Sequence, residues 1–114
     1  MGGPRVTSKL LVGAMLRQVQ ASGGFGTVVR HGDDIAGIIL IVATERSRNP
    51  RIFEQIRNMA GALEWARIGT EMKEAPPAVD EYLERRVKSD PDIWIIELDI
   101  ADEEQLNAIM SLSN

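Results

Sequence analysis

The stretch 35–44, IAGIILIVAT, is the longest apolar run in the chain. A strand with one face in water alternates apolar and polar residues, whereas this run is apolar at nearly every position. We therefore expect a β-strand over 35–44 that is covered on both faces and lies at the centre of a sheet. Gly37 lies inside the run, which indicates a bulge or a close approach of another backbone segment.

The residues before this run predict a helix and then a β-hairpin. Thr7 or Ser8 can cap the helix, and its apolar residues recur at spacings of one, three or four, so that they share one face. These residues are Leu11, Val12, Met15, Leu16 and Val19. A β-branched segment predicts a strand over 25–31, and the Gly-Asp-Asp that follows supplies turn residues between it and 35–44.

Residues 50–63 carry conflicting signals. With Asn49 as the cap and Pro50 in the first turn, their apolar residues form a helical stripe, and periodicity slightly favours this helix. The alternative is a β-hairpin with strands over 51–57 and 62–68. A family resemblance described below favours the hairpin, and we expect the hairpin.

The second half of the chain predicts a helix and a final strand. Acidic residues come early and basic residues late in 78–89, which suits the dipole of a helix. The sequence Asp-Pro-Asp then predicts a turn, which leads into a mostly apolar strand over 93–98. We expect this strand in the same sheet, beside the strand over 35–44 or next to it.

Together these elements predict an α+β fold in one domain over 1–114, with a loose leader at 1–6 and a variable tail at 100–114. Asp102 and Gln105 have the spacing of a capping pair, which allows a short C-terminal helix in that tail. Two helices on a sheet leave open what covers its second face. The C-terminal segment or a second copy of the chain would cover it, and we predict a homodimer.

The composition is that of an ordinary soluble domain with an aliphatic core. Of the 114 residues, 44% are hydrophobic, 26% are charged and 4% are aromatic. The chain has no cysteine, which excludes disulfides, thiolate catalysis and cysteine-ligated metals and fits a reducing cytoplasm. No segment has the pattern of a membrane span or a signal peptide, so we expect a cytoplasmic protein without a membrane partner.

Opposite charges divide the chain. Residues 1–57 carry eight Lys and Arg against four Asp and Glu, and residues 58–114 carry five against thirteen. Because nucleic-acid binders are generally basic, the acidic second half argues against a nucleic-acid partner. Arg46, Arg48 and Arg51 belong to the one candidate anion-binding cluster, but their simpler interpretation is a solvated charged loop.

Motifs of catalysis and cofactor binding are missing from the sequence. His31 is the only histidine, which excludes an HExxH metal site. The glycine-rich segment at 22–26 connects a predicted helix to a strand, the reverse of the order in phosphate-binding loops, and no serine lies in a GxSxG motif. We therefore predict no catalytic residue, metal site or cofactor, and we expect a non-enzymatic binding or protein-interaction module.

The alternative is a small-ligand site or an enzyme site near the start of the last strand. It would use Arg17, Arg30 and Asp92 beside Trp94, with Asp90 as a second carboxylate. These residues also have simpler interpretations, because paired aspartates often satisfy the amides of a turn. Trp94, like Trp65, is more often a packing anchor than a ligand-stacking residue. Convergence of the side chains in one concave pocket would support the site.

Two long segments and a tryptophan between them carry a family resemblance. The segments are LLVGAMLRQVQASGGFGTVVRHGDDIAGIILIV and VDEYLERRVKSDPDIWIIELD, of which DPDIWIIE is the most specific part. The chain resembles the bacterial family called domain of unknown function 1491 at Arg17, Gly24, Gly32, Gly37, Trp65, Tyr82, Arg85, Asp90, Pro91, Asp92, Trp94 and Glu97. The resemblance implies a cytoplasmic bacterial α+β domain and supplies no catalytic residue. The loop at 45–50 and the tail after Asp99 depart from the family pattern.

Overall fold

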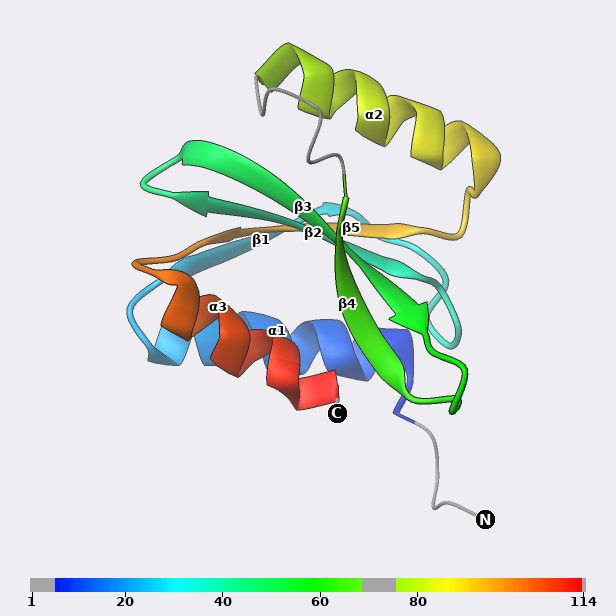
Figure 1. Ribbon diagram of the computed structural model, residues 1–114, viewed down its shortest axis with the longest axis horizontal. Helices are drawn as coiled ribbons and strands as arrows, with labels where there is room; N and C mark the ends of the chain where they lie inside the picture. Colours follow the sequence, from blue (N-terminus) through cyan, green and yellow to red (C-terminus); the bar gives the residue numbers. More distant parts are fainter. Residues whose placement is uncertain (1–5, 69–75, 114) are drawn as a thin grey trace.

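The computed structural model describes residues 6–68 and 76–113, in which one five-stranded sheet lies between helices (Figure 1). The strands are β1 (Phe25–Arg30), β2 (Ile39–Glu45), β3 (Arg48–Arg57), β4 (Leu63–Ile68) and β5 (Trp94–Asp99). The helices are α1 (Ser8–Ala21), α2 (Pro76–Ser89) and α3 (Glu103–Met110), followed by the 3-10 turn η1 (Ser111–Ser113). This arrangement confirms the predicted α+β class. Within the described ranges, no helix is long and apolar enough to cross a membrane.

The central strand of the sheet is β2, in the strand order β1-β5-β2-β3-β4. It pairs in parallel with β5 and antiparallel with β3, and every residue from Ile39 to Thr44 is buried. The apolar run therefore forms the predicted central strand with both faces covered. The strand predicted over 93–98 forms as β5 and lies beside β2, as expected.

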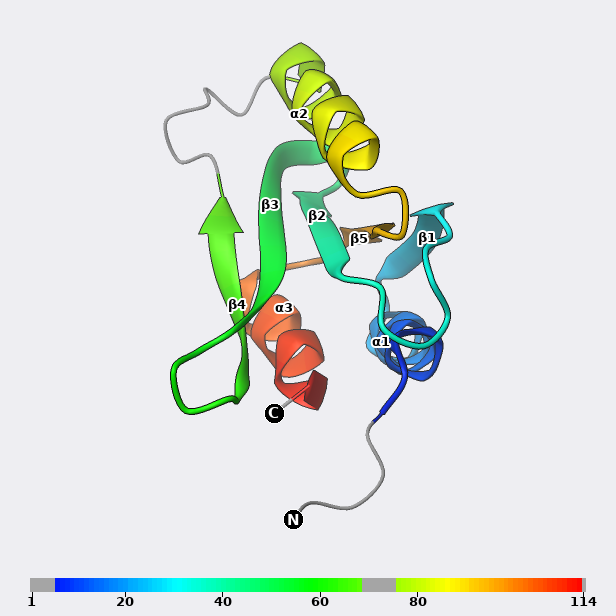
Figure 2. The ribbon, with the colours of Figure 1, turned by 90° about the vertical axis from the view of Figure 1, so that its right-hand side faces the viewer.

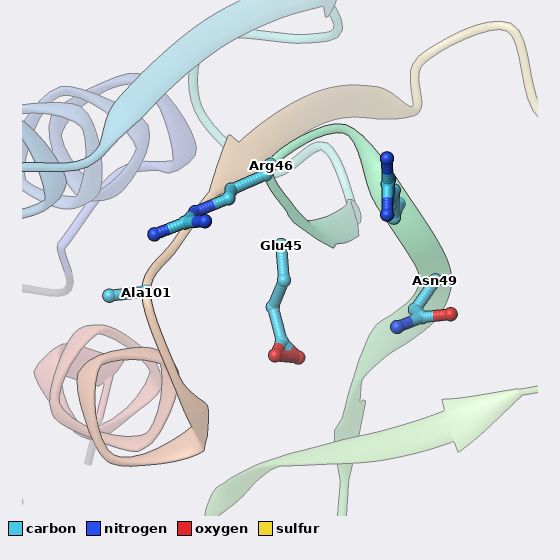
Figure 3. Close-up of a pocket in the computed structure, with 5 residues that line it drawn as sticks. Glu45, Arg46, Asn49 and Ala101 are labelled. Atoms are coloured by element: carbon cyan, nitrogen blue, oxygen red, sulfur yellow. The ribbon is translucent and has the colours of Figure 1, made fainter.

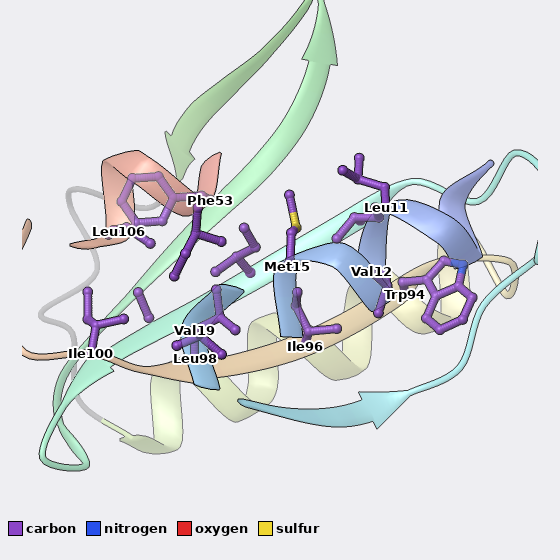
Figure 4. Packing of buried hydrophobic residues seen from close by; sticks show 14 residues of the cluster. Leu11, Val12, Met15, Val19, Phe53, Trp94, Ile96, Leu98, Ile100 and Leu106 are labelled. Atoms are coloured by element: carbon purple, nitrogen blue, oxygen red, sulfur yellow. The ribbon is translucent and has the colours of Figure 1, made fainter. Parts of the chain in front are cut away.

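Helices cover both faces of the sheet, with α1 and α3 on one side and α2 on the other (Figures 1 and 2). We call these the α1/α3 side and the α2 side. The core of the α1/α3 side contains Met15, Trp94 and Leu106 (Figure 4), and the core of the α2 side contains Leu40 and Ile95. Because α2 covers the second face of the sheet over β2, β3 and β5, a wholly uncovered face no longer gives a reason to expect a second copy.

The prediction that the strands over 25–31 and 35–44 pair as a hairpin is wrong. The strand β5 lies between β1 and β2, and β2 begins at Ile39 instead of Ile35. Pairing β2 with β5 places two apolar strands side by side, and both are buried along most of their length. A pairing of β2 with β1 would set it against a strand whose side chains are mostly exposed, so burial of apolar surface favours the observed order.

The turn residues between β1 and β2 instead fix a long loop over 31–38. The carboxylate of Asp33 accepts hydrogen bonds from the backbone N–H groups of Ile35 and Ala36, at 3.1 and 2.9 Å. The carbonyl oxygens of Asp34 and Ile35 accept bonds from the first N–H groups of α1. The Gly-Asp-Asp segment therefore does form a turn, but this turn belongs to a loop that hydrogen-bonds to the start of α1.

The hairpin expected over 50–63 is confirmed as β3 and β4, which pair antiparallel. Asn58 organises the turn between them. Its side-chain oxygen accepts hydrogen bonds from the N–H groups of Ala60 and Ala62 at 2.9 and 3.0 Å, and its side-chain amide donates to Glu64 at 2.5 Å. These bonds satisfy the turn within the hairpin itself, which a helix over 50–63 would not do.

The end of the chain packs into the core on the α1/α3 side. The carboxylate of Asp102 accepts a bond from the N–H of Gln105 at 2.9 Å, and the Gln105 side chain accepts one from Ala101 at 2.7 Å. This confirms the capping pair. Leu106 and Ile109 are fully buried, so the region expected as a variable tail contributes to the core. The leader expected at 1–6 lies, apart from its last residue, outside the described residues.

Candidate functional site

A groove of about 790 Å³ opens on the α1/α3 side, between the loop at 35–38 and the β3–β4 hairpin. The hairpin bends away from the other strands in Figures 1 and 2. Four separate parts of the chain contribute exposed apolar side chains to the groove: Val6, Ile35, Ile38, Ile56 and Leu112. Val6 and Ile35 are 66% and 70% exposed, which is unusual for apolar residues that gather on one concave surface.

The groove exists because β3 extends beyond the start of β2. Pairing between β2 and β3 ends at Leu40 opposite Glu54, whereas pairing between β3 and β4 continues to Arg57 opposite Leu63. Among the described residues, the stretch 55–57 therefore has a ladder partner on its β4 edge but not on its β2 edge. The open edge offers backbone donors and acceptors to a bound chain.

Hydrogen bonds and close packing hold the loop at 35–38 in place. The hydroxyl of Ser8 donates to the carbonyl oxygen of Gly37 at 2.6 Å, and the Ser8 N–H donates to Ile35 at 3.1 Å. A Cβ on Gly37 would lie 2.4 Å from the carbonyl oxygen of Asp92, so only glycine fits there. The loop is thus pre-organised, which reduces the entropy lost when a ligand binds.

The opposite wall of the groove is tied to the C-terminal turn. The indole N–H of Trp65, on β4, donates to the carbonyl oxygen of Met110 at 3.1 Å and to the hydroxyl of Ser113 at 2.9 Å. These bonds connect β4 to η1, which contributes Leu112 to the groove. Trp65 is therefore a packing anchor, as the sequence suggested, and its anchoring also shapes the groove.

The charged residues of the groove bind groups within the chain. Arg86 of α2 forms a two-pronged ion pair with the carboxylate of Glu54, at 3.0 and 2.9 Å, and this hydrogen bonding raises the pKa of Arg86 above its ordinary value. The guanidinium of Arg57 donates to the carbonyl oxygen of Gly61 at 2.5 Å. The groove thus combines apolar contacts and an open strand edge with the exposed, positively charged Arg57.

Four of the five predicted site residues meet where β5 begins. Arg30 donates to the carbonyl oxygen of Pro91 at 2.8 Å, and the carboxylate of Asp90 accepts the N–H of Asp92 at 3.1 Å. Trp94 is 2% exposed and belongs to the core. These contacts bind the chain to itself, and none of the four residues lines the groove.

The fifth predicted residue, Arg17, is exposed on α1, outside the groove. One of its guanidinium nitrogens lies 3.3 Å from the position of a Cβ on Gly13. The side chain therefore folds back along its own helix, over the glycine one turn earlier.

His31 has a partner that sequence reasoning missed. Its Nε2 lies 2.6 Å from a carboxylate oxygen of Asp34, and its ring lies against the ring of Trp94 with 4.1 Å between centroids. The hydrogen bond with His31 lowers the pKa of the Asp34 carboxyl below its ordinary value. The pair stabilises the loop that carries Ile35. The sequence signal that could have predicted it is a histidine and an aspartate three residues apart.

Of the arginines at 46–51, Arg46 lies in the turn between β2 and β3, and Arg48 and Arg51 belong to β3. Arg46 and Arg48 are exposed, as the interpretation of a solvated charged loop expects. Arg51 is buried, with ion pairs to Glu45 and to Glu103 of α3. Arg46, Arg48 and Glu45 line a hollow of about 370 Å³. Figure 3 shows Arg46 and the Glu45 carboxylate at this hollow. Nearby acidic groups make this hollow a poor anion site. In the described ranges, no group of three or more His, Asp or Glu residues could hold a metal ion.

A family profile and two solved structures link this chain to the same protein family. The family profile described as "Protein of unknown function (DUF1491)" matches residues 6–108. A DUF1491 family protein from Caulobacter crescentus CB15, solved by crystallography, is 32% identical, with a TM-score of 0.78 over 85% of this chain and 90% of that one. An NMR structure of a DUF1491 family protein from Caulobacter crescentus CB15 gives 32% identity and a TM-score of 0.77 over 88% of this chain and 90% of that one.

A more distant protein from A. tumefaciens shares the fold, with 22% identity and a TM-score of 0.73 over 87% of this chain and 89% of that one. A comparison with curated proteins finds no match. The profile match includes the loop at 45–50 and most of α3. This chain therefore belongs to the DUF1491 family.

Proposed function

We propose that this protein is a non-enzymatic binding module and that its groove takes an extended, apolar segment of a partner protein. One observation carries the proposal: exposed apolar side chains from four parts of the chain converge on one concave surface. Apolar side chains that converge on one concave surface, unlike apolar residues scattered singly over a surface, mark a candidate binding site. Absence of familiar catalytic motifs is compatible with this proposal but does not carry it.

The shape of the groove favours a peptide in strand conformation. Its volume of about 790 Å³ suits a few apolar side chains. The open edge at 55–57 supplies backbone hydrogen bonds, and an added strand directs alternate side chains toward the same surface. A peptide whose backbone pairs with β3 would direct one alternating set of apolar residues toward the α1/α3 side, against Ile35 and Leu112.

The rival proposal is a small-ligand site that uses Arg17, Arg30 and Asp92 near Trp94. It has less support, because Arg30 and Trp94 already bind backbone oxygens and Arg17 lies along α1. We also propose a cytoplasmic location, which the lack of cysteine supports.

A selection from a random peptide library tests the binding proposal. The purified protein is used to enrich 12-residue peptides, and the affinities of the enriched peptides are measured by calorimetry. We expect peptides with alternating apolar residues, and we expect Ile35→Lys to weaken their binding roughly tenfold or more, because a charge would enter an apolar contact.

The matched control is Val29→Lys on β1, where a valine is 57% exposed and lies outside the groove. This variant should keep the wild-type affinity. If no peptide is enriched, or if Ile35→Lys and Val29→Lys bind the enriched peptides equally well, the groove is not a peptide site.

A further inference from the structure

We propose that two copies of this protein associate through β1, whose free edge pairs antiparallel with the β1 edge of the second copy. The two five-stranded sheets would then form one continuous sheet. The occupant of this edge is thus a second copy of the chain, and the inference is independent of the groove. It rests on the difference between the two edges of the sheet.

Over Phe25–Val28, the β1 edge carries neither a proline nor a charged residue, two features that usually prevent strands from pairing. The strand reads FGTVVR and has neither a proline nor a lysine. Its apolar side chains are exposed, at 66% for Phe25, 38% for Val28 and 57% for Val29. Natural edge strands are generally blunted by charge or proline, so an exposed apolar edge marks a site of strand addition.

The opposite edge, β4, is protected. It reads LEWARI, and its two exposed positions are the charged residues Glu64 and Arg67. Its Trp65 is also held by the C-terminal turn. A sheet with one charged edge and one apolar edge offers a single edge for pairing, which favours a closed dimer over an open chain of molecules.

The face of β1 that would join the interface is not covered by a helix. Gly26 packs against Leu16 and Val19 of α1, so Phe25 and Thr27 point to the other face of the sheet. On that face the α2 core, as far as the described residues show, takes no side chain from β1. A second copy paired at this edge would place its own exposed β1 side chains beside them, which removes part of their surface from water.

Charge favours a second copy in the antiparallel direction. The start of β1 lies beside acidic residues of β5, with Phe25 opposite Asp99 and Thr27 opposite Glu97. The end of β1 carries Arg30, followed by a histidine. An antiparallel pair brings the basic end of one strand beside the acidic end of its partner, which is the complementarity that a two-fold interface requires.

The geometry of β1 also limits the strength of the interface. The register between β1 and β5 shifts between Val28 and Arg30, and such a bulge twists the strand locally. The regular part is therefore Phe25–Val28. An interface built on so short a ladder is smaller than the roughly 800 Å² per partner of a standard complex, so we expect a weak dimer with a dissociation constant on the order of micromolar.

A single-cysteine design tests this pairing directly, because the natural chain has no cysteine. Thr27 is exposed at the middle of β1, so a cysteine in Thr27→Cys would lie near its copy across the two-fold axis. We expect mild oxidation to give a disulfide-linked dimer. The matched control is Glu64→Cys on β4, an exposed residue of the protected edge, which should give far less dimer at the same concentration.

Sedimentation velocity without any cross-link provides the second measurement. Wild-type protein should show a dimer that grows with concentration, and the double variant Phe25→Lys/Val29→Lys should weaken it roughly tenfold or more, because like charges would face each other. The variant Ile35→Lys, in the groove, should dimerise normally. A strict monomer at high micromolar concentration, equal cross-linking of the two cysteine variants, or loss of the dimer in Ile35→Lys alone would overturn the proposal.

Discussion

The two sides of the sheet bury apolar residues in different ways. On the α2 side, one helix covers a small core. The ion pair between Glu54 of β3 and Arg86 of α2 lies at the edge of this core. On the α1/α3 side, two helices cover a larger core, yet that side still opens into the groove beside Ile35. On the α2 side, the described core residues of β2, β3 and β5 are thus covered within one chain, while the α1/α3 side combines a strong core with a surface available for binding.

The largest expected effect is a cavity on the α1/α3 side. Leu106 is fully buried in that core, so Leu106→Ala should lower the free energy of unfolding by about 3 kcal/mol. The comparison variant is Leu83→Ala on the α2 side, where the leucine is only partly buried. Urea denaturation should show a clearly smaller loss for Leu83→Ala, and equal losses would contradict a division into a strong and a weaker core.

The ion pair on the α2 side should have the next largest effect. Arg86 and Glu54 are 21% and 22% exposed, so Arg86→Ala leaves a largely buried carboxylate without its partner and should cost about 2 kcal/mol. The double variant Glu54→Ala/Arg86→Ala should lose less than the sum of the two single variants. If the losses of unfolding free energy measured by urea denaturation are strictly additive, Glu54 and Arg86 do not stabilise each other.

A smaller effect should connect stability to the groove. Trp65→Phe removes two hydrogen bonds to the C-terminal turn, which should cost about 1 kcal/mol and weaken binding of a selected peptide. The control on the α2 side is Tyr82→Phe, which removes the bond that Arg86 donates to the Tyr82 hydroxyl at 2.7 Å. Calorimetry should find normal peptide affinity for Tyr82→Phe; equal weakening by both variants would break the distinction between the two sides.

The smallest effect should be a pH dependence of the loop beside the groove. The hydrogen bond with His31 holds the pKa of Asp34 below its ordinary value of 3.8. The stability that this carboxylate contributes is therefore present above pH 3.8 and is lost as pH falls through the lower pKa of the folded protein. In thermal unfolding across this acid range, Asp34→Asn should lack that component, and an unchanged acid profile would argue against the pair.

Local signals in the sequence were enough to predict most elements but not their order in the sheet. Caps such as Thr7 and the Asp102–Gln105 pair, and the burial of the run at 39–44, depend on near neighbours or on composition. The insertion of β5 between β1 and β2 depends on a parallel pairing of residues far apart in sequence, and no turn motif encodes it. The Gly-Asp-Asp signal therefore suggested a hairpin that the fold does not contain.

The groove escaped prediction for a related reason. Ile35 and Ile38 belong to the apolar run, so they were assigned to the buried strand, although Ile35 is 70% exposed in the loop before it. Leu112 and Val6 join them only through the packing of the two chain ends on the α1/α3 side. Residue type did identify Trp65 and Trp94 as anchors, because large aromatic side chains usually pack whatever the topology.

The most direct test of the binding proposal is an NMR titration of ¹⁵N-labelled protein with a peptide selected on the wild type. We predict that amide signals shift at 35–38, at 55–57 on β3 and at η1, where the groove is lined. The signals of β1 and of α2 should stay in place. Shifts confined to β1 or to the α2 side, with the groove amides unchanged, would contradict the claim that the open end of the α1/α3 side is the binding site.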